Sequence, residues 1–223
     1  MRLAASSRSA PDESVPAAPV WHTASVVLAL VAIALGELVW SGAPTTSVTA
    51  DRRVVYVRML VGSLGFAVFA SGLGQRRRLL SKLWSGTQSL LVEVLLAGML
   101  LAVIVGIESA FPERNGALLR ILPATREEQL WWCAVALVVA CSEELVYRAY
   151  LRPQLARLFR SGWLGVLGQA ALFGLGHATQ GPFAALRIGA YGALLGWLAW
   201  RRGNITACAL CHVAIDGLAG LCG

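Results

Sequence analysis

Charged residues are scarce in this sequence. Only 14% of its 223 residues are Asp, Glu, Lys or Arg, whereas 57% are hydrophobic and the mean hydropathy is +0.65. This balance excludes an ordinary soluble domain, in which about 25% of the residues are charged. Because a helix needs about 20 apolar residues to cross a hydrocarbon core of about 30 Å, the length allows roughly six to eight spans. Little chain remains for a separate soluble catalytic domain, so any chemistry must lie within the helical bundle or at its rim.

Other features that would mark different protein classes are also missing. The five cysteines lie in or beside apolar runs, so they imply no disulfide framework. No internal repeat supports a transporter built from duplicated halves. The net charge of +7 does not require a nucleic-acid partner, because arginines in the short loops of a membrane protein first report its orientation. We therefore expect the lipid bilayer, and no nucleic acid, as a partner.

Seven apolar runs of helical length predict an all-α, polytopic membrane bundle of about seven transmembrane helices. Residues 1–22 are polar and contain proline, which predicts a mobile tail, and 23–223 then form a single transmembrane domain. Glycine pairs such as Gly165 with Gly168 and Gly192 with Gly196 predict close helix packing. The seven runs cover residues 23–41, 54–73, 88–110, 129–151, 161–179, 183–200 and 204–222.

The basic residues predict the orientation of the chain. The tail, the 74–86 loop, the 148–160 segment and the Arg201–Arg202 pair together hold 12 of the 19 Lys and Arg residues. The loops on the opposite side hold five. Because cytoplasmic loops are enriched in Lys and Arg, this asymmetry predicts a cytoplasmic N-terminus and an external C-terminus, in the plasma (inner) membrane of a bacterium.

Three polar patterns interrupt the last hundred residues, where charges within apolar helices are functional candidates by default. The fourth run ends in Glu143-Glu144, followed by Arg148 four residues after the second glutamate, so that one carboxylate can pair while the other stays available. The fifth run contains Phe173 and His177, and the seventh contains His212 and Asp216; each pair is spaced to share one helix face. The fourth run could alternatively end at a solvated face, with its arginines as simple counter-charges.

The order and spacing of these patterns resemble the CPBP family, which comprises the type II CAAX prenyl endopeptidases and their bacteriocin-processing and immunity relatives. The family pattern reads EExxxR, then FxxxH, then HxxxN or a variant, and the match covers residues 143–216, within a predicted catalytic core at about 129–222. The resemblance implies a metal-independent, glutamate-dependent intramembrane endopeptidase that needs no cofactor. Its substrate would be a peptide or membrane protein, for which a prenylated CAAX protein, a peptide leader and a C-terminal sorting tail all remain open.

The resemblance also implies roles for individual residues. Glu143 would be the general base that activates a water, and His177 would help to hold that water. His212 and residue 216 would line the oxyanion pocket, while Glu144 and Arg148 would support the first glutamate and the helix geometry. These residue types suit the reaction, since peptide hydrolysis needs a base for water and donors for the developing oxyanion.

Residue 216 departs from the family pattern, because Asp216 stands where Asn is more usual. An ionised aspartate cannot donate a hydrogen bond to an oxyanion. Asp216 must then be protonated, act as a partner that orients His212, or reflect altered chemistry. The departure also leaves open a non-enzymatic immunity or scaffold protein of the same fold.

Two other chemistries use the same residues. Glu143, His177 and His212 could form a zinc site with one open position, although no H-E-x-x-H motif is present. The stretch from Cys208 to His212 matches the C-x-x-C-H pattern of covalent haem attachment, but it lies within an apolar run that leaves no room for a porphyrin.

The proposed site makes a geometric demand on two helices. A straight helix from Ser161 would place His177 roughly 24 Å along its axis, away from Glu143. We therefore expect the fourth helix to continue past Arg148 to about Leu151, and the fifth to enter late or lie displaced inward. Separations above about 8 Å between Glu143, His177 and His212 would contradict the assignment.

Overall fold

The computed structural model describes residues 18–42, 51–72, 89–111 and 116–222 of the chain. Within these ranges the chain is helical apart from short turns and contains no strand, which confirms the all-α prediction. The elements are α1 (Val20–Gly42), α2 (Arg52–Ala70), α4 (Leu90–Ala110), α5 (Gly116–Ile121), α6 (Arg126–Glu143), η1 (Glu144–Leu151), α7 (Arg152–Leu158), α8 (Gly162–Gly176), η2 (Ala178–Gln180), α9 (Pro182–Arg202) and α10 (Thr206–Cys222).

Each of the seven apolar runs forms a helix. Five helical segments are long and apolar enough to cross a membrane, and the α6, η1 and α7 elements together make one of them, Arg126–Leu158. The helices at Gly162–Gly176 and Thr206–Leu221 are apolar but shorter. These spans identify an integral membrane protein. Residues 1–17 of the predicted tail lie outside the described residues, and α1 begins at Val20, three residues before the predicted run.

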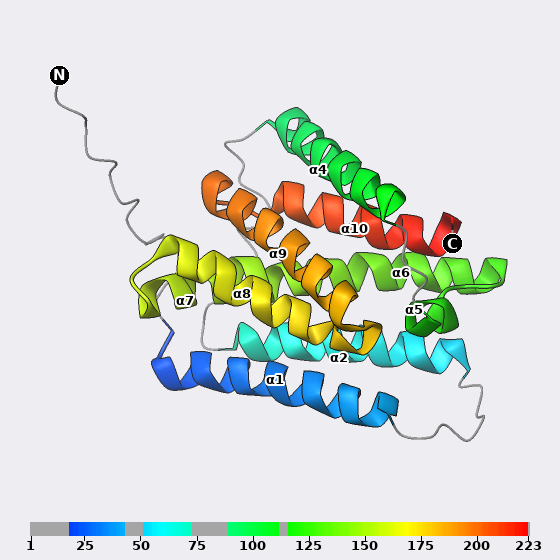
Figure 1. Cartoon of the computed structure of the whole chain (residues 1–223), viewed down its shortest axis with the longest axis horizontal. Helices are drawn as coiled ribbons and strands as arrows, with labels where there is room; N and C mark the ends of the chain where they lie inside the picture. The colour runs from blue at the N-terminus through cyan, green and yellow to red at the C-terminus, as the bar shows by residue number, and fades with distance from the viewer. Residues whose placement is uncertain (1–17, 43–50, 73–88, 112–115, 223) are drawn as a thin grey trace.

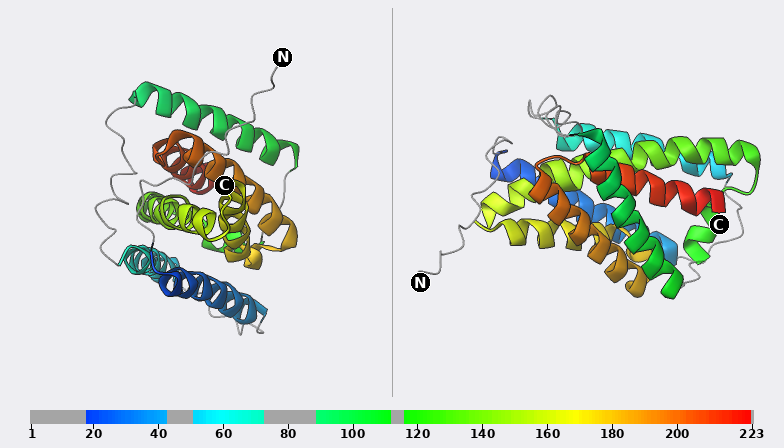
Figure 2. Two further views of the ribbon diagram at one scale, coloured as in Figure 1. Left: turned by 90° about the vertical axis from the view of Figure 1, so that its left-hand side faces the viewer. Right: turned by 90° about the horizontal axis from the view of Figure 1, so that it is seen from above.

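The helices are layered around α6, which lies in the middle of the bundle between α2 and α10 (Figure 1). The α4 helix crosses the outer side of α10, and α8 packs against α9, α7 and α1. The left view of Figure 2 shows the same order, with α4 at one side of the bundle and α1 and α2 at the other. The helices that carry the three polar patterns therefore lie side by side.

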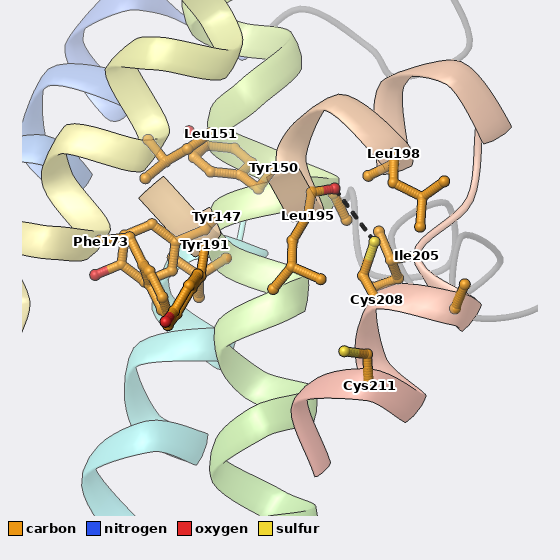
Figure 3. Packing of buried hydrophobic residues seen from close by; sticks show 14 of the residues in the cluster. Tyr147, Tyr150, Leu151, Phe173, Tyr191, Leu195, Leu198, Ile205, Cys208 and Cys211 are labelled. Carbon is orange, nitrogen blue, oxygen red and sulfur yellow. Dashed lines mark hydrogen bonds between the residues drawn. The ribbon is translucent and has the colours of Figure 1, made fainter. Parts of the chain in front are cut away.

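The largest buried cluster surrounds η1, and residues of α8, α9 and α10 meet it there (Figure 3). Tyr147, Tyr150 and Leu151 of η1 pack there against Phe173 of α8. Residues of α9 and α10 complete the cluster, and they include Tyr191, Leu195, Leu198, Cys208 and Cys211. Dense apolar packing on this side holds η1 in place and leaves its polar residues to face α8 and α10.

Glycines permit the close helix approaches, as predicted. A Cβ atom added at Gly165 would lie 2.5 Å from the backbone oxygen of Arg152, and one at Gly192 would lie 3.0 Å from the Phe173 ring. Because an alanine would not fit at the first position without a shift of the backbone, Gly165 sets the distance between α7 and α8. Gly192 allows Phe173 to lie against α9.

The helix that carries the double glutamate is longer and less regular than the prediction of 129–151. It starts at a capping box in which Thr125 and Glu128 satisfy each other's backbone N–H groups. It continues past Pro153 to Leu158. The η1 segment before Pro153 is a π-helix, in which the Arg152 N–H donates to the Tyr147 carbonyl five residues earlier. A proline ring clashes with the carbonyl four residues before it in a regular α-helix, so the wider π turn accommodates Pro153 without ending the helix.

Candidate active site

The two adjacent glutamates lie at the junction of α6 and η1 and have different surroundings. The Glu143 side chain is 26% exposed, whereas the Glu144 side chain is fully buried. Glu144 is therefore the enclosed carboxylate, whereas Glu143 keeps access to solvent. The π-helical geometry begins at this junction, and such insertions are frequent at functional sites.

Glu144 is held by a buried arginine from the same segment. Its Oε1 atom lies 3.0 Å from Arg148 Nη1, and both side chains are fully buried. The Arg148 guanidinium carbon lies 4.2 Å from the centroid of the Phe173 ring, within the range of a cation–π interaction. Arg148 is therefore compensated by a carboxylate and by an aromatic face, as a buried charge requires.

His212 of α10 joins the two glutamates and Asp216. Its Nδ1 atom lies 2.9 Å from Glu144 Oε1. Since an ionised carboxylate can only accept, Nδ1 is the donor of this hydrogen bond when Glu144 is ionised. Its Nε2 atom lies 3.6 Å from Glu143 Oε2 and 3.7 Å from Asp216 Oδ2. These two separations are longer than direct hydrogen bonds but short enough for strong electrostatic interaction.

Asp216 lies one turn after His212, with its side chain 30% exposed. Its backbone oxygen accepts a hydrogen bond of 2.8 Å from the Trp132 indole of α6. Trp132 in turn packs edge to face on Tyr56 of α2. This hydrogen bond fixes the position of α10 along its axis relative to α6, and with it the position of Asp216 relative to Glu143. Trp132 is not marked as a site residue by the sequence, in which its indole N–H is its one polar feature.

His177 lies at the end of α8, where it is the C-terminal cap residue. Its Nδ1 atom lies 2.9 Å from the Phe173 backbone oxygen. A carbonyl oxygen can only accept, so Nδ1 carries the hydrogen, and in the neutral ring Nε2 is left as an acceptor. The His177 ring lies 4.8 Å, and the His212 ring 5.7 Å, from the centroid of the Phe173 ring. Phe173 therefore contacts both histidines as well as Arg148.

The expectation for the fourth helix is confirmed, whereas the fifth does not enter late, since α8 begins at Gly162. The fourth helix does extend past Arg148, and it continues to Leu158. The fifth ends as an α-helix at Gly176, before the predicted residue 179, and a short 3₁₀ turn at Ala178–Gln180 follows it. Its C-terminal end carries His177, whose ring lies against Phe173 as the His212 ring does, so His177 stands at a helix terminus and not in the middle of a straight span. Glu143 and His212 lie well within the limit of about 8 Å that a shared water would require.

The donor set that could have bound zinc is not arranged around one point. Within the described part of the chain, no group of three or more His, Cys, Asp and Glu side chains is placed to hold a metal ion. His177 and His212 each direct Nδ1 to another partner, and His212 Nε2 lies between two carboxylates. The expectation that no cofactor is needed stays a prediction, which metal analysis of the purified protein would test.

The cysteines of the haem-like pattern lie inside the packed core (Figure 3). Cys208 and Cys211 are each 1% exposed, and the Cys208 thiol donates to the Leu195 backbone oxygen at 3.2 Å. Their surroundings are those of small core residues.

A histidine that the sequence analysis had placed in the tail lies against η1. His22 is buried near the start of α1, and its Nδ1 atom lies 2.6 Å from the Tyr150 hydroxyl. Thr23 also approaches that hydroxyl, at 3.4 Å. Pro19 directly before the helix was the signal that could have moved the predicted helix start to include His22, because proline is common at helix N-termini.

Part of the chain that carries these residues matches a known protein family. Residues 125–218 match the family model described as type II CAAX prenyl endopeptidase Rce1-like. The match confirms the resemblance for this stretch and supports peptide-bond hydrolysis at the level of the family. No curated protein and no solved structure matches the chain.

Proposed function

From the match of residues 125–218 to the Rce1-like family, we propose that the protein is an intramembrane endopeptidase that uses a glutamate-activated water. The observation that carries the proposal is the half-buried Glu143 carboxylate, 3.6 Å from the Nε2 atom of a histidine that is itself held by the buried Glu144–Arg148 pair. A base that keeps access to water, beside groups fixed in a packed shell, is the arrangement that hydrolysis requires.

Glu143 is the general base in the proposed reaction. It takes a proton from a water, and the water oxygen bonds to the carbonyl carbon of the scissile peptide while the carbonyl π electrons move to oxygen. When the C–N bond breaks, the proton held by Glu143 passes to the leaving amine. His177 Nε2, an acceptor in the neutral ring, receives the second hydrogen of the water as a hydrogen bond and orients its lone pair.

Asp216 and His212 act together in this scheme. The pair, separated by 3.7 Å, holds one exchangeable proton, either on the ring as an imidazolium or on the carboxyl group as an acid. Each form presents one N–H or O–H donor on the Glu143 side of the pair. An aspartate can therefore occupy the position where the family usually has asparagine, provided that His212 stays paired with it.

Terminal-peptide proteomics tests the function without a guess at the substrate. Membranes from native host cells that carry wild type, Glu143→Gln or Glu127→Gln are compared for unprocessed N- and C-terminal peptides, with the level of each variant measured. Glu127 is the matched control, because it lies on the same helix, its side chain is 58% exposed, and it pairs with the exposed Arg53 at 2.8 Å.

We expect precursors to accumulate with Glu143→Gln and not with Glu127→Gln, and the accumulated peptides identify the substrate class. Unchanged termini at a normal level of the Glu143→Gln protein would reject the enzyme and favour an immunity or scaffold protein, which the Asp216 departure also supports. Zinc bound at one equivalent, and lost together with activity in His177→Ala, would replace the glutamate mechanism by a zinc-dependent one.

A further inference from the structure

We propose that Tyr147 is a further catalytic residue, whose hydroxyl donates a hydrogen bond to the oxyanion that forms on the scissile carbonyl. This inference rests on the proposed peptidase function and adds a donor to it. The chain has four tyrosines, and they differ in whether the hydroxyl has a hydrogen-bond partner in the protein.

Three of the four tyrosine hydroxyls have partners in the protein. Tyr56 donates to the Ile121 backbone oxygen at 2.8 Å, Tyr150 bonds to a histidine at 2.6 Å, and Tyr191 donates to a glutamate at 2.9 Å. No hydrogen bond joins the Tyr147 hydroxyl to any described residue, although the side chain is 7% exposed. The oxygen lacks a partner among the described residues without being fully enclosed, so it is open to a hydrogen bond with a water or a substrate.

The position of the hydroxyl is close to the reacting groups. Tyr147 follows Glu143 by four residues, and its ring lies edge to face on Phe173, with 5.1 Å between centroids. The hydroxyl oxygen lies 3.5 Å from the point where a Cβ atom of Gly176 would stand. Gly176 directly precedes His177, so the hydroxyl reaches the end of α8 that carries the proposed water-holding histidine.

The electrostatics of the site explain why such a donor is needed. Glu143, Glu144 and Asp216 bring three carboxyl groups together, whereas Arg148 is the only arginine in this cluster of described residues. An oxyanion that forms among carboxylates is opposed by their charge. A phenol stays neutral and can donate at any pH where the base works, whereas an ionised aspartate can only accept. Tyr147 therefore supplies a donor that does not depend on where the Asp216–His212 pair holds its proton.

The test compares two hydroxyl deletions on the same π-helical segment. Tyr147→Phe and Tyr150→Phe each remove one oxygen and keep the ring, and Tyr150 is the control because its hydroxyl bonds to α1 and not to the site. The readout is the pulse-chase processing rate, in native host cells, of the precursors that accumulate with Glu143→Gln. The thermal midpoint and the membrane level of each variant are measured in parallel.

We expect Tyr147→Phe to slow processing by about 10- to 100-fold at an unchanged thermal midpoint, since loss of one oxyanion donor has an effect of this order or larger. Tyr150→Phe should lower the midpoint and leave the rate within about twofold of wild type. In an Asp216→Asn background, where the amide can donate, the effect of Tyr147→Phe should shrink.

The inference alone would be overturned by processing by Tyr147→Phe at the wild-type rate, or by a loss no greater than that of Tyr150→Phe. An equal effect of Tyr147→Phe in the wild-type and Asp216→Asn backgrounds would also reject the oxyanion role. If Glu143→Gln accumulates no precursor, the proposed function fails and the role of Tyr147 with it, and that outcome is distinct from the others.

Discussion

Removal of one charge from the buried Glu144–Arg148 pair should be far more costly than removal of both. In Arg148→Met the apolar stem of the side chain is largely retained, but the fully buried Glu144 carboxylate loses the cation 3.0 Å away. An uncompensated buried charge typically costs about 3–5 kcal/mol, so we expect a loss of that size in the free energy of unfolding. The lost contact with the Phe173 ring lies within this range.

The double variant Glu144→Gln/Arg148→Met should recover most of this loss. Both charges are then absent, while the glutamine side-chain oxygen can still accept the hydrogen bond that His212 Nδ1 makes at 2.9 Å. Replacement of a whole buried ion pair by uncharged groups is often neutral, so the double variant should lie within about 1.5 kcal/mol of wild type. The two changes should thus be non-additive by about 2 kcal/mol or more.

Reversible unfolding by SDS in mixed micelles, followed by far-ultraviolet circular dichroism, measures these differences. The exposed pair between Arg53 and Glu127 is the control, because its side chains are 54% and 58% exposed and Arg53→Met should cost only about 0–1 kcal/mol. A loss below about 1 kcal/mol for Arg148→Met, or a double variant as unstable as the sum of the two single changes, would refute the reasoning that the pair is buried and mutually dependent.

Two further predictions concern helix packing away from the site. Glu93→Gln removes the charge of a buried carboxylate that accepts a hydrogen bond from an α9 arginine at 2.6 Å. The thermal midpoint of this variant should fall further than that of Glu108→Gln, because the Glu108 side chain is 40% exposed. Equal shifts of the two variants in differential scanning fluorimetry would contradict this. Gly165→Ala places a methyl group 2.5 Å from a backbone oxygen at the start of α7 and should lower the free energy of unfolding by about 1–3 kcal/mol. Gly98→Ala, which has nothing within 4 Å of the added atom, should change it by less than about 0.5 kcal/mol. Equal stabilities of the two variants in SDS unfolding would show that α7 and α8 can move apart freely.

The site could be predicted from the sequence as far as residue types and spacing go. Glu144 with Arg148 and His212 with Asp216 are each four residues apart, and both pairs are in contact in the structure. Spacing along one helix carries this information because residues i and i+4 lie on the same face of an α-helix. The same reasoning failed for His22, since a helix start within a polar, proline-containing stretch has a weak local signal.

The contacts between helices could not be predicted in this way. Nothing in the sequence indicated that Glu144 Oε1 accepts from His212 while Glu143 stays half-exposed, because that choice depends on the rotation of α6 against α10. The π-helical turn matters here, since it changes which residues after Glu143 face α8. The position of the Tyr147 hydroxyl at the end of α8, without a partner among the described residues, likewise depends on where α8 lies.

The sequence by itself determined that this is a helical membrane protein and which polar residues interrupt its apolar helices, because hydrophobicity and helical spacing are local properties of the chain. Only the tertiary structure decided which carboxylate is paired, which ring nitrogens are occupied and how His177 reaches the site from a helix end. Those features are set by distances between helices that are remote in sequence, and close approaches such as those at Gly165 and Gly192 set the distances of α8 from α7 and α9.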